Sequence, residues 1–100
     1  MAKKVKGRTR RQLYEGALGR PLDGLSVLAF QFRNEGDQQR AHYDLLSANP
    51  KPQYAMYDGC RTQAYIITQP EWEEQITAIV KAAGGQQFEP VIDRVENVAE

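Results

Sequence analysis

The alternation of apolar and polar residues predicts that the chain after residue 24 begins with a buried strand and a helix. The run Leu25 to Arg33 has apolar residues on both of its faces, which is typical of an interior strand covered on two sides. Asn34 is a favourable helix N-cap, and the helix after it, from Glu35 to about Ala48, ends before Asn49-Pro50. The apolar face of this helix is predicted to consist of Ala41, His42, Leu45, Leu46 and Ala48.

A hairpin is predicted next. The segments Gln53 to Tyr57 and Arg61 to Gln69 are rich in Tyr, Ile and Thr, which favour strands. Asp58-Gly59 lies between the two segments and is typical of a tight turn that joins antiparallel strands.

A second helix and a last strand complete the pattern. Thr68 to Glu71 fits a capping box with a proline in the first turn, and Gly84-Gly85 ends the helix. The apolar residues at helical spacing between these limits are Trp72, Ile76, Ile79, Val80 and Ala83. The last strand is expected from Phe88 to about Val98, with Val91 and Val95 facing inward and with Pro90 tolerated because the strand lies at a sheet edge.

The order of these elements predicts a ferredoxin-like α+β sandwich, in which two helices cover one face of a four-stranded antiparallel sheet. The first and third strands are expected in the interior of the sheet, and the second and fourth at its edges. One hundred residues, of which 41% are hydrophobic and 26% charged, fit one folded domain. We expect that domain at residues 25–100, preceded at residues 1–24 by a basic arm and a short helix that Thr9 caps and Gly19 ends.

The neutral net charge conceals an asymmetry between the start of the chain and the rest. The first twelve residues carry six cations and no acid, whereas the remainder carries seven basic and 13 acidic residues, a net charge of −6. Such a contrast is typical of an interaction arm, and clustered cations attract phosphate groups. The candidate phosphate-binding residues are Lys3, Lys4, Lys6, Arg8, Arg10 and Arg11. A solvated tail that only promotes solubility is the alternative explanation.

The segment Arg61 to Thr68 resembles in part the octamer on the third strand of RNA-recognition domains, whose aromatic residues stack on bases. The matching positions are Arg61, Ala64, Tyr65 and Ile66. Thr62 stands where that family has a glycine, and Gln63 and Thr68 replace two aromatic residues. The resemblance does not assign the chain to the family, but it adds Arg61 and Tyr65 to the candidate nucleic-acid-binding residues.

No catalytic, metal or cofactor site is expected. His42 and Cys60 are the single histidine and the single cysteine, and neither an orienting third group nor an oxyanion loop is recognisable in the sequence. Zinc sites built on paired thiolates need more cysteines than this chain has. No apolar stretch approaches the roughly 18–20 residues that span a bilayer, and we expect a cytoplasmic protein with no membrane partner.

Two functions are therefore favoured over a third, ligand sensing by a dimer, for which the sequence offers no evidence. The first is a non-enzymatic accessory or regulatory protein that contacts the phosphates of DNA or RNA through its basic arm. The alternative is a protein–protein interaction module, either an inhibitor or a subunit of a larger complex, which acts through its acidic body or an edge strand. Pairing of an edge strand with its own copy would make a homodimer.

Overall fold

The chain folds as two compact units, of which the larger contains a four-stranded sheet and two helices. The computed structural model describes residues 8–93, 95 and 96. The larger unit is Gly24–Pro90, and the smaller unit contains the described residues up to Asp23 and those from Val91 onward. The assignment of residues 25–100 to one domain stays a prediction.

The sheet of the larger unit has the strand order β3-β4-β2-β5, and each neighbouring pair is antiparallel. The interior strands are β2 (Ser26–Gln31) and β4 (Gln63–Thr68), and the edge strands are β3 (Tyr54–Cys60) and β5 (Gln86–Phe88). An α+β fold with a four-stranded antiparallel sheet is thus confirmed. The two segments with the densest apolar runs lie in the interior, where both faces of a strand are buried.

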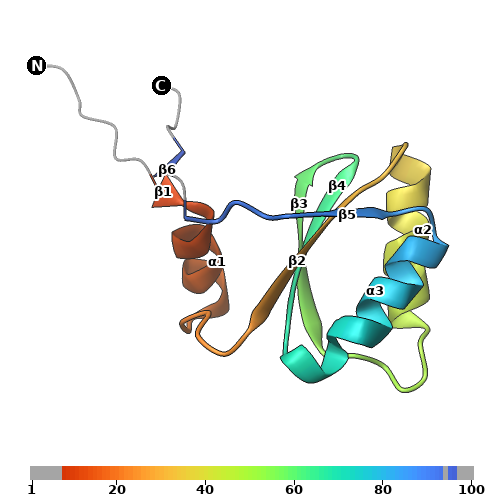
Figure 1. The fold of residues 1–100 in the computed structure, drawn as a ribbon, viewed down its shortest axis with the longest axis horizontal. Helices are drawn as coiled ribbons and strands as arrows, with labels where there is room; N and C mark the ends of the chain where they lie inside the picture. Colours follow the sequence, from red (N-terminus) through yellow and green to blue (C-terminus); the bar gives the residue numbers. More distant parts are fainter. Residues whose placement is uncertain (1–7, 94, 97–100) are drawn as a thin grey trace, which may run out of the picture. The chain divides into compact units, whose positions relative to one another are not determined.

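Two helices lie beside each other on one side of this sheet (Figure 1). They are α2 (Glu35–Leu46) and α3 (Glu73–Ala82), and a short 3-10 turn, η1 (Pro70–Trp72), precedes α3. As predicted, Asn34 caps α2, because its side-chain oxygen accepts a hydrogen bond from the backbone N–H of Asp37 at 2.8 Å. The core between the helices and the sheet consists of Leu28, Phe30, Phe32, Ala41, Leu45, Ala64, Ile66, Ile76, Val80 and Ala83.

The turn of the hairpin lies later than predicted. Strand β3 continues through Asp58-Gly59 to Cys60, and the turn is formed by Arg61 and Thr62. The register between β3 and β4 shifts between Asp58 and Cys60, so that Gly59 is the extra residue of a β-bulge. The prediction of a turn at Asp58-Gly59 is therefore wrong, because a glycine suits a bulge as well as it suits a tight turn.

The predicted capping box at Thr68 is also wrong. Gln69 is the residue before η1, and its side chain makes no capping hydrogen bond. The hydroxyl of Thr68 instead donates to the backbone carbonyl of Gln53 at 2.6 Å. Thr68 is buried at the end of β4, and its hydroxyl is satisfied by the residue that precedes β3 rather than by the helix that follows.

The predicted last strand is replaced by two shorter ones. β5 ends at Phe88, two residues before Pro90, which has no N–H to donate to a ladder. Val91 is 54% exposed rather than inward-facing. Farther along, β6 (Val95–Glu96) pairs with β1 (Arg8–Thr9) in a separate two-stranded sheet, so the continuous strand from Phe88 to Val98 does not form.

The smaller unit contains the predicted short helix, α1 (Arg10–Leu18). The hydroxyl of Thr9 accepts from the backbone N–H of Gln12 at 3.0 Å, and the Gln12 side chain accepts from the backbone N–H of Thr9 at the same distance. Gly19 ends the helix with a φ of 74°, which favours glycine. Both capping predictions for this helix are confirmed.

Candidate functional site

The cations at the start of the chain are only partly described. Lys3, Lys4 and Lys6 lie outside the described residues, and Arg8 is described through its backbone in β1. The guanidinium of Arg10 donates from Nη1 to the hydroxyl of Tyr14 at 3.3 Å. Contact of this arm with phosphate stays a prediction.

Arg11 is paired with a carboxylate of the chain itself. Its Nε lies 2.6 Å from Oδ1 of Asp93, and its Nη2 lies 3.3 Å from Oδ2. These hydrogen bonds hold the pKa of Asp93 below its usual value and raise the pKa of Arg11. A phosphate would therefore have to compete with Asp93 for this guanidinium.

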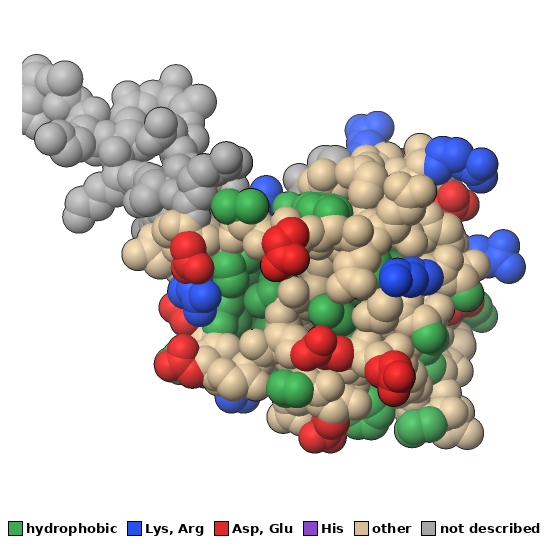
Figure 2. Space-filling view, viewed as in Figure 1, with side chains coloured by type: hydrophobic (Ala, Val, Ile, Leu, Met, Phe, Trp, Pro, Cys, Tyr) green, Lys and Arg blue, Asp and Glu red, His purple; other side chains and the backbone are tan. Residues whose placement is uncertain are grey.

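The two candidate residues on the hairpin differ in exposure. Arg61 is exposed in the turn between β3 and β4, whereas Tyr65 lies in the interior strand β4 and is 6% exposed. The ring of Tyr65 meets the ring of Phe88 edge to face, with 5.9 Å between the centroids and 87° between the planes. A base stacks on an exposed ring face, which Tyr65 does not offer. On the face drawn in Figure 2, several basic side chains lie toward the upper right, and most of the acidic ones lie elsewhere on the face.

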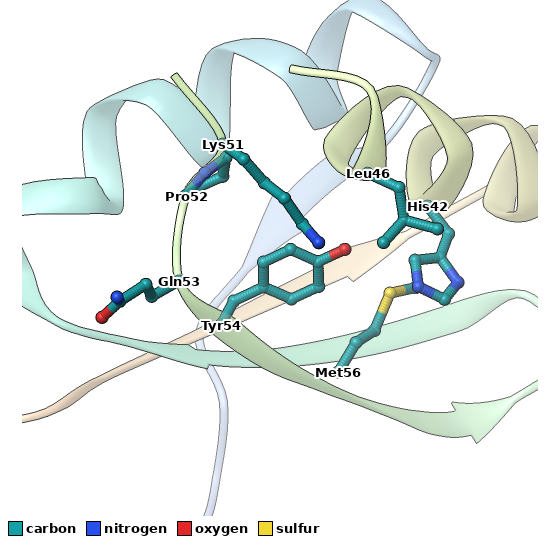
Figure 3. A pocket seen from close by; sticks show the side chains of 7 residues that line it. All are labelled: His42, Leu46, Lys51, Pro52, Gln53, Tyr54 and Met56. Atoms are coloured by element: carbon teal, nitrogen blue, oxygen red, sulfur yellow. The ribbon is translucent and has the colours of Figure 1, made fainter. Parts of the chain in front are cut away.

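A groove lies between helix α2 and the edge strand β3. It has a volume of about 660 Å³ and is lined by His42, Leu46, Lys51, Pro52, Gln53, Tyr54 and Met56 (Figure 3). A smaller hollow of about 120 Å³ shares His42 and Met56 with this groove and is lined also by Glu35, Gln38 and Gln39. The hollows thus follow the helix from its first turn to its last, alongside β3.

The helix side of this groove corrects a prediction. Ala41 and Leu45 are buried as expected, but His42 is exposed and Leu46 is 49% exposed. Gln39, His42 and Leu46 are spaced so that they lie along one face of α2. The apolar face of the helix is therefore narrower than predicted, and its exposed flank lines the groove.

Tyr54 carries the unusual group of the groove. Its hydroxyl oxygen is buried and has no hydrogen-bond partner among the described residues, a condition that it shares with Nε1 of Trp72. Burial raises the pKa of Tyr54 above the usual tyrosine value. The ring of His42 lies edge-on to the ring of Tyr54, with 6.3 Å between the centroids.

One hydrogen bond at the end of the sheet shows which opposite residues of β2 and β4 exchange backbone hydrogen bonds. The backbone N–H of Phe32 donates to the carbonyl of Thr62 at 2.7 Å, and these two residues stand opposite each other when the register of β2 and β4 is continued. Opposite pairs in an antiparallel ladder alternate between those that exchange hydrogen bonds and those that do not. Tyr65 and Ile67 therefore direct their backbone groups away from β2 and toward β3.

The same alternation fixes which backbone groups of β3 are free. Tyr57 and Ala55 stand opposite Tyr65 and Ile67, and they exchange hydrogen bonds with β4. Tyr54 and Met56 consequently direct their N–H and C=O groups outward. Within the described part of the chain β3 pairs with β4 alone, so these outward groups face the open edge of the sheet. Sequence periodicity did not reveal this site, because it depends on the packing of α2 beside the edge.

The residues that the structure describes contain neither a cluster of metal ligands nor a membrane-spanning helix. No group of three or more His, Cys, Asp or Glu side chains is placed there to hold a metal ion. None of the helices in residues 8–93 has the length and apolar character needed to cross a membrane. Comparison of the chain with family models, with curated proteins and with solved structures gives no match.

Proposed function

We propose that this chain is a protein-interaction module that accepts an extended segment of a partner protein as an additional strand beside β3. The observation that carries the proposal is the outward direction of the backbone groups of Tyr54 and Met56 at the groove beside α2. Main-chain hydrogen bonds to an edge strand supply affinity in this mode of recognition, and pockets for alternate side chains supply specificity.

The proposed architecture is ferredoxin-like. The elements of the larger unit follow one another as β2, α2, β3, β4, α3 and β5, and the strand order β3-β4-β2-β5 supports this topology. In such an arrangement the strand after the first helix lies at an edge of the sheet. The helix that precedes it lies next to this edge, which is the geometry the groove requires.

The two edges of the sheet differ in a way that favours β3. β5 is three residues long and is followed closely by Glu89 and Pro90, which are features that protect an edge from pairing. β3 has seven residues, and its segment Tyr54–Tyr57 pairs regularly with β4 before the bulge. This segment contains no charged residue and no proline. It is therefore the better template for an incoming strand.

A peptide selection tests the proposal. A displayed library of random linear peptides is selected on the folded protein, and an enriched peptide is synthesised with both ends blocked. We expect its binding to slow hydrogen exchange at the backbone amides of Tyr54 and Met56, because these amides would donate to the added strand. Enrichment of no peptide, or binding that leaves both amides unprotected, would contradict the proposal.

Two variants at one position separate the backbone from the side chain. Met56→Pro removes the outward N–H and leaves the ladder with β4 intact, since edge strands tolerate proline where the N–H faces outward. Met56→Ala truncates the side chain and keeps the N–H. We expect the enriched peptide to bind Met56→Ala and to lose binding to Met56→Pro.

Nucleic-acid binding by the arm is a second proposal, supported by the six cations in the first twelve residues. Its test replaces Lys3, Lys4 and Lys6 with alanine and measures binding to DNA and RNA at two salt concentrations. Phosphate contacts predict affinity that falls as salt rises and that falls again in the variant. Peptide binding at β3 is expected to be the same in this variant, so the two proposals are tested independently.

A further inference from the structure

The charges and donors of the groove at β3 indicate what an incoming strand carries. Of the residues that line the groove, Lys51 alone has a formal charge, and it takes part in no ion pair among the described residues. Figure 3 shows the Lys51 side chain extending across the groove toward the hydroxyl of Tyr54. The two groups make no hydrogen bond with each other. The groove thus brings an ammonium group toward a phenolic hydroxyl that has no hydrogen-bond partner among the described residues.

A carboxylate is the chemical partner that both groups lack. The ammonium group of lysine only donates hydrogen bonds, and the hydroxyl of tyrosine has one hydrogen to donate. A carboxylate has two oxygens and accepts from both, and charge-assisted bonds of this kind are stronger than neutral ones. The hydroxyl of Tyr54 is buried without a partner among the described residues, so donating a hydrogen bond to the carboxylate would also remove an existing cost of burial.

The register of an added strand places this carboxylate on a side chain. The side chain of Tyr54 points to the helix side of the sheet, where it packs against the core, and that of Met56 points to the same side. A residue directly opposite Tyr54 on the added strand would have its side chain on this side, within reach of Lys51. The residue two positions along would lie beside Met56 and Leu46, which are apolar.

We infer that the strand bound at β3 belongs to a partner protein and carries an Asp or Glu opposite Tyr54, with an apolar residue two positions away opposite Met56. This inference rests on the proposed function. Lys51 and the Tyr54 hydroxyl hold the acidic side chain, while Met56 and Leu46 contact the apolar one. The charges along the two hollows agree with this placement of the acidic side chain, because the cation Lys51 lies at the end near Tyr54 and the acid Glu35 lies at the other end.

The test uses synthetic peptides with both ends blocked, built on the peptide enriched by selection. One peptide has Glu at the position opposite Tyr54, the second has Gln there, and the third has Gln there with a free carboxyl terminus. We expect wild-type protein to bind the Glu peptide about tenfold more tightly than the Gln peptide, as one charge-assisted contact would give. Equal affinity for the Glu and Gln peptides, or recovery of full affinity by the free terminus, would overturn the inference.

Three protein variants show which residues produce the preference for the Glu peptide over the Gln peptide. Lys51→Met keeps most of the stem and removes the charge, Tyr54→Phe removes the hydroxyl, and Lys81→Met removes a cation of α3 that does not line the groove. We expect the preference for Glu to fall strongly in the first two variants and to persist in Lys81→Met. Binding of the Gln peptide is expected to survive in all three.

The outcomes separate this inference from the proposed function. If peptides protect the amides of Tyr54 and Met56 but show no preference for Glu, strand addition stands and the acidic contact is wrong. A preference that survives Lys51→Met unchanged places the carboxylate elsewhere and also overturns the inference. If no peptide protects these amides, the proposed function fails and the inference fails with it.

Discussion

Replacing Tyr54 with phenylalanine is expected to stabilise the folded protein. The substitution keeps the ring and removes a hydroxyl that is buried without a hydrogen-bond partner among the described residues. In the unfolded chain that hydroxyl is bonded to water, so folding costs the free energy of stripping the water away. Phenylalanine does not carry this cost. Deleting a polar atom that has hydrogen-bond partners usually lowers the stability of the folded protein instead.

The magnitude follows from the state of the hydroxyl. An unsatisfied buried donor costs about 1–3 kcal/mol, and the low end applies here because the Tyr54 side chain is half-buried. We therefore expect Tyr54→Phe to raise the free energy of unfolding by about 1 kcal/mol. For a domain of this size, 1 kcal/mol corresponds to a rise of roughly 4–8 °C in Tm.

Tyr14→Phe is the matched control. The hydroxyl of Tyr14 accepts a hydrogen bond from Arg10 at 3.3 Å, so removing it deletes a contact rather than an unsatisfied group. Urea unfolding of both variants at neutral pH should show Tyr54→Phe more stable than wild type and Tyr14→Phe less stable. Equal slopes against urea concentration would show that the same surface is exposed on unfolding in each protein.

The pH dependence gives a second measurement on the same residue. Burial raises the pKa of Tyr54, so above the usual tyrosine pKa the unfolded chain releases this proton before the folded one does. The unfolded state then binds fewer protons, and wild-type stability falls as pH rises from the unfolded pKa through the folded pKa. Tyr54→Phe lacks this loss, and its advantage over wild type should grow in that alkaline range.

A loss of stability in Tyr54→Phe would contradict this prediction. If Tyr54→Phe is destabilised at neutral pH as much as Tyr14→Phe, the Tyr54 hydroxyl has a partner in solution. The premise of an unpaired donor in the groove would then be wrong. A carboxylate at this position would then be supported by the charge of Lys51 alone.

Two further predictions concern other parts of the fold. Gly85→Ala should lower the free energy of unfolding by about 1–3 kcal/mol in urea titrations, because its Cβ would lie 2.6 Å from Cγ1 of Val80. Gly16→Ala, in α1 with nothing within 4 Å of the added carbon, should instead raise it by about 0.5–1 kcal/mol, and equal shifts in the two variants would contradict this account. Asp93→Asn should be less stable than wild type at neutral pH, and the difference should vanish as pH falls through the pKa of Asp93, which Arg11 lowers; a difference independent of pH would show that the ion pair is not its cause.

Local chemistry made parts of the fold predictable. The N-caps Thr9 and Asn34 and the C-cap Gly19 act within four residues along the chain, so the sequence alone contains all the partners. The strand Ser26–Gln31 was recognisable because its apolar residues point to both faces. These elements are determined by neighbours in sequence or by burial on two sides.

Predictions failed where a distant segment provides the partner. Thr68 has the sequence context of a capping residue, but its hydroxyl donates instead to the carbonyl of Gln53, the residue before β3. Gly59 satisfies the needs of both a turn and a bulge, and the pairing with β4 decides between them. Neither choice can be made from the local sequence, because the partner that decides it lies on another segment of the chain.

The groove was missed for a related reason. Periodicity placed His42 and Leu46 on the buried face of α2, next to Ala41 and Leu45. When the apolar face of a helix is wider than the area that packs on the sheet, the residues along one side of that face stay exposed. The position of β3 shows that this side contains His42 and Leu46. The sequence does contain a signal for the groove. The apolar face of α2 includes more residues than the two, Ala41 and Leu45, that the core buries.

The hydroxyl of Tyr54, like Nε1 of Trp72, is buried without a hydrogen-bond partner among the described residues, whereas the side chains of Thr68 and Gln38 are satisfied. The hydroxyl of Thr68 donates to the carbonyl of Gln53, and the side-chain amide of Gln38 donates to the carbonyl of Gln63 at 2.7 Å. A buried group without a hydrogen-bond partner lowers stability, and proteins accept such losses at functional sites. Removing the hydroxyl of Tyr54 should therefore have two measurable effects: it raises stability and weakens the preference for an acidic peptide. Gly85→Ala provides the contrast, since a variant that only disturbs packing should change stability while folded molecules keep that preference.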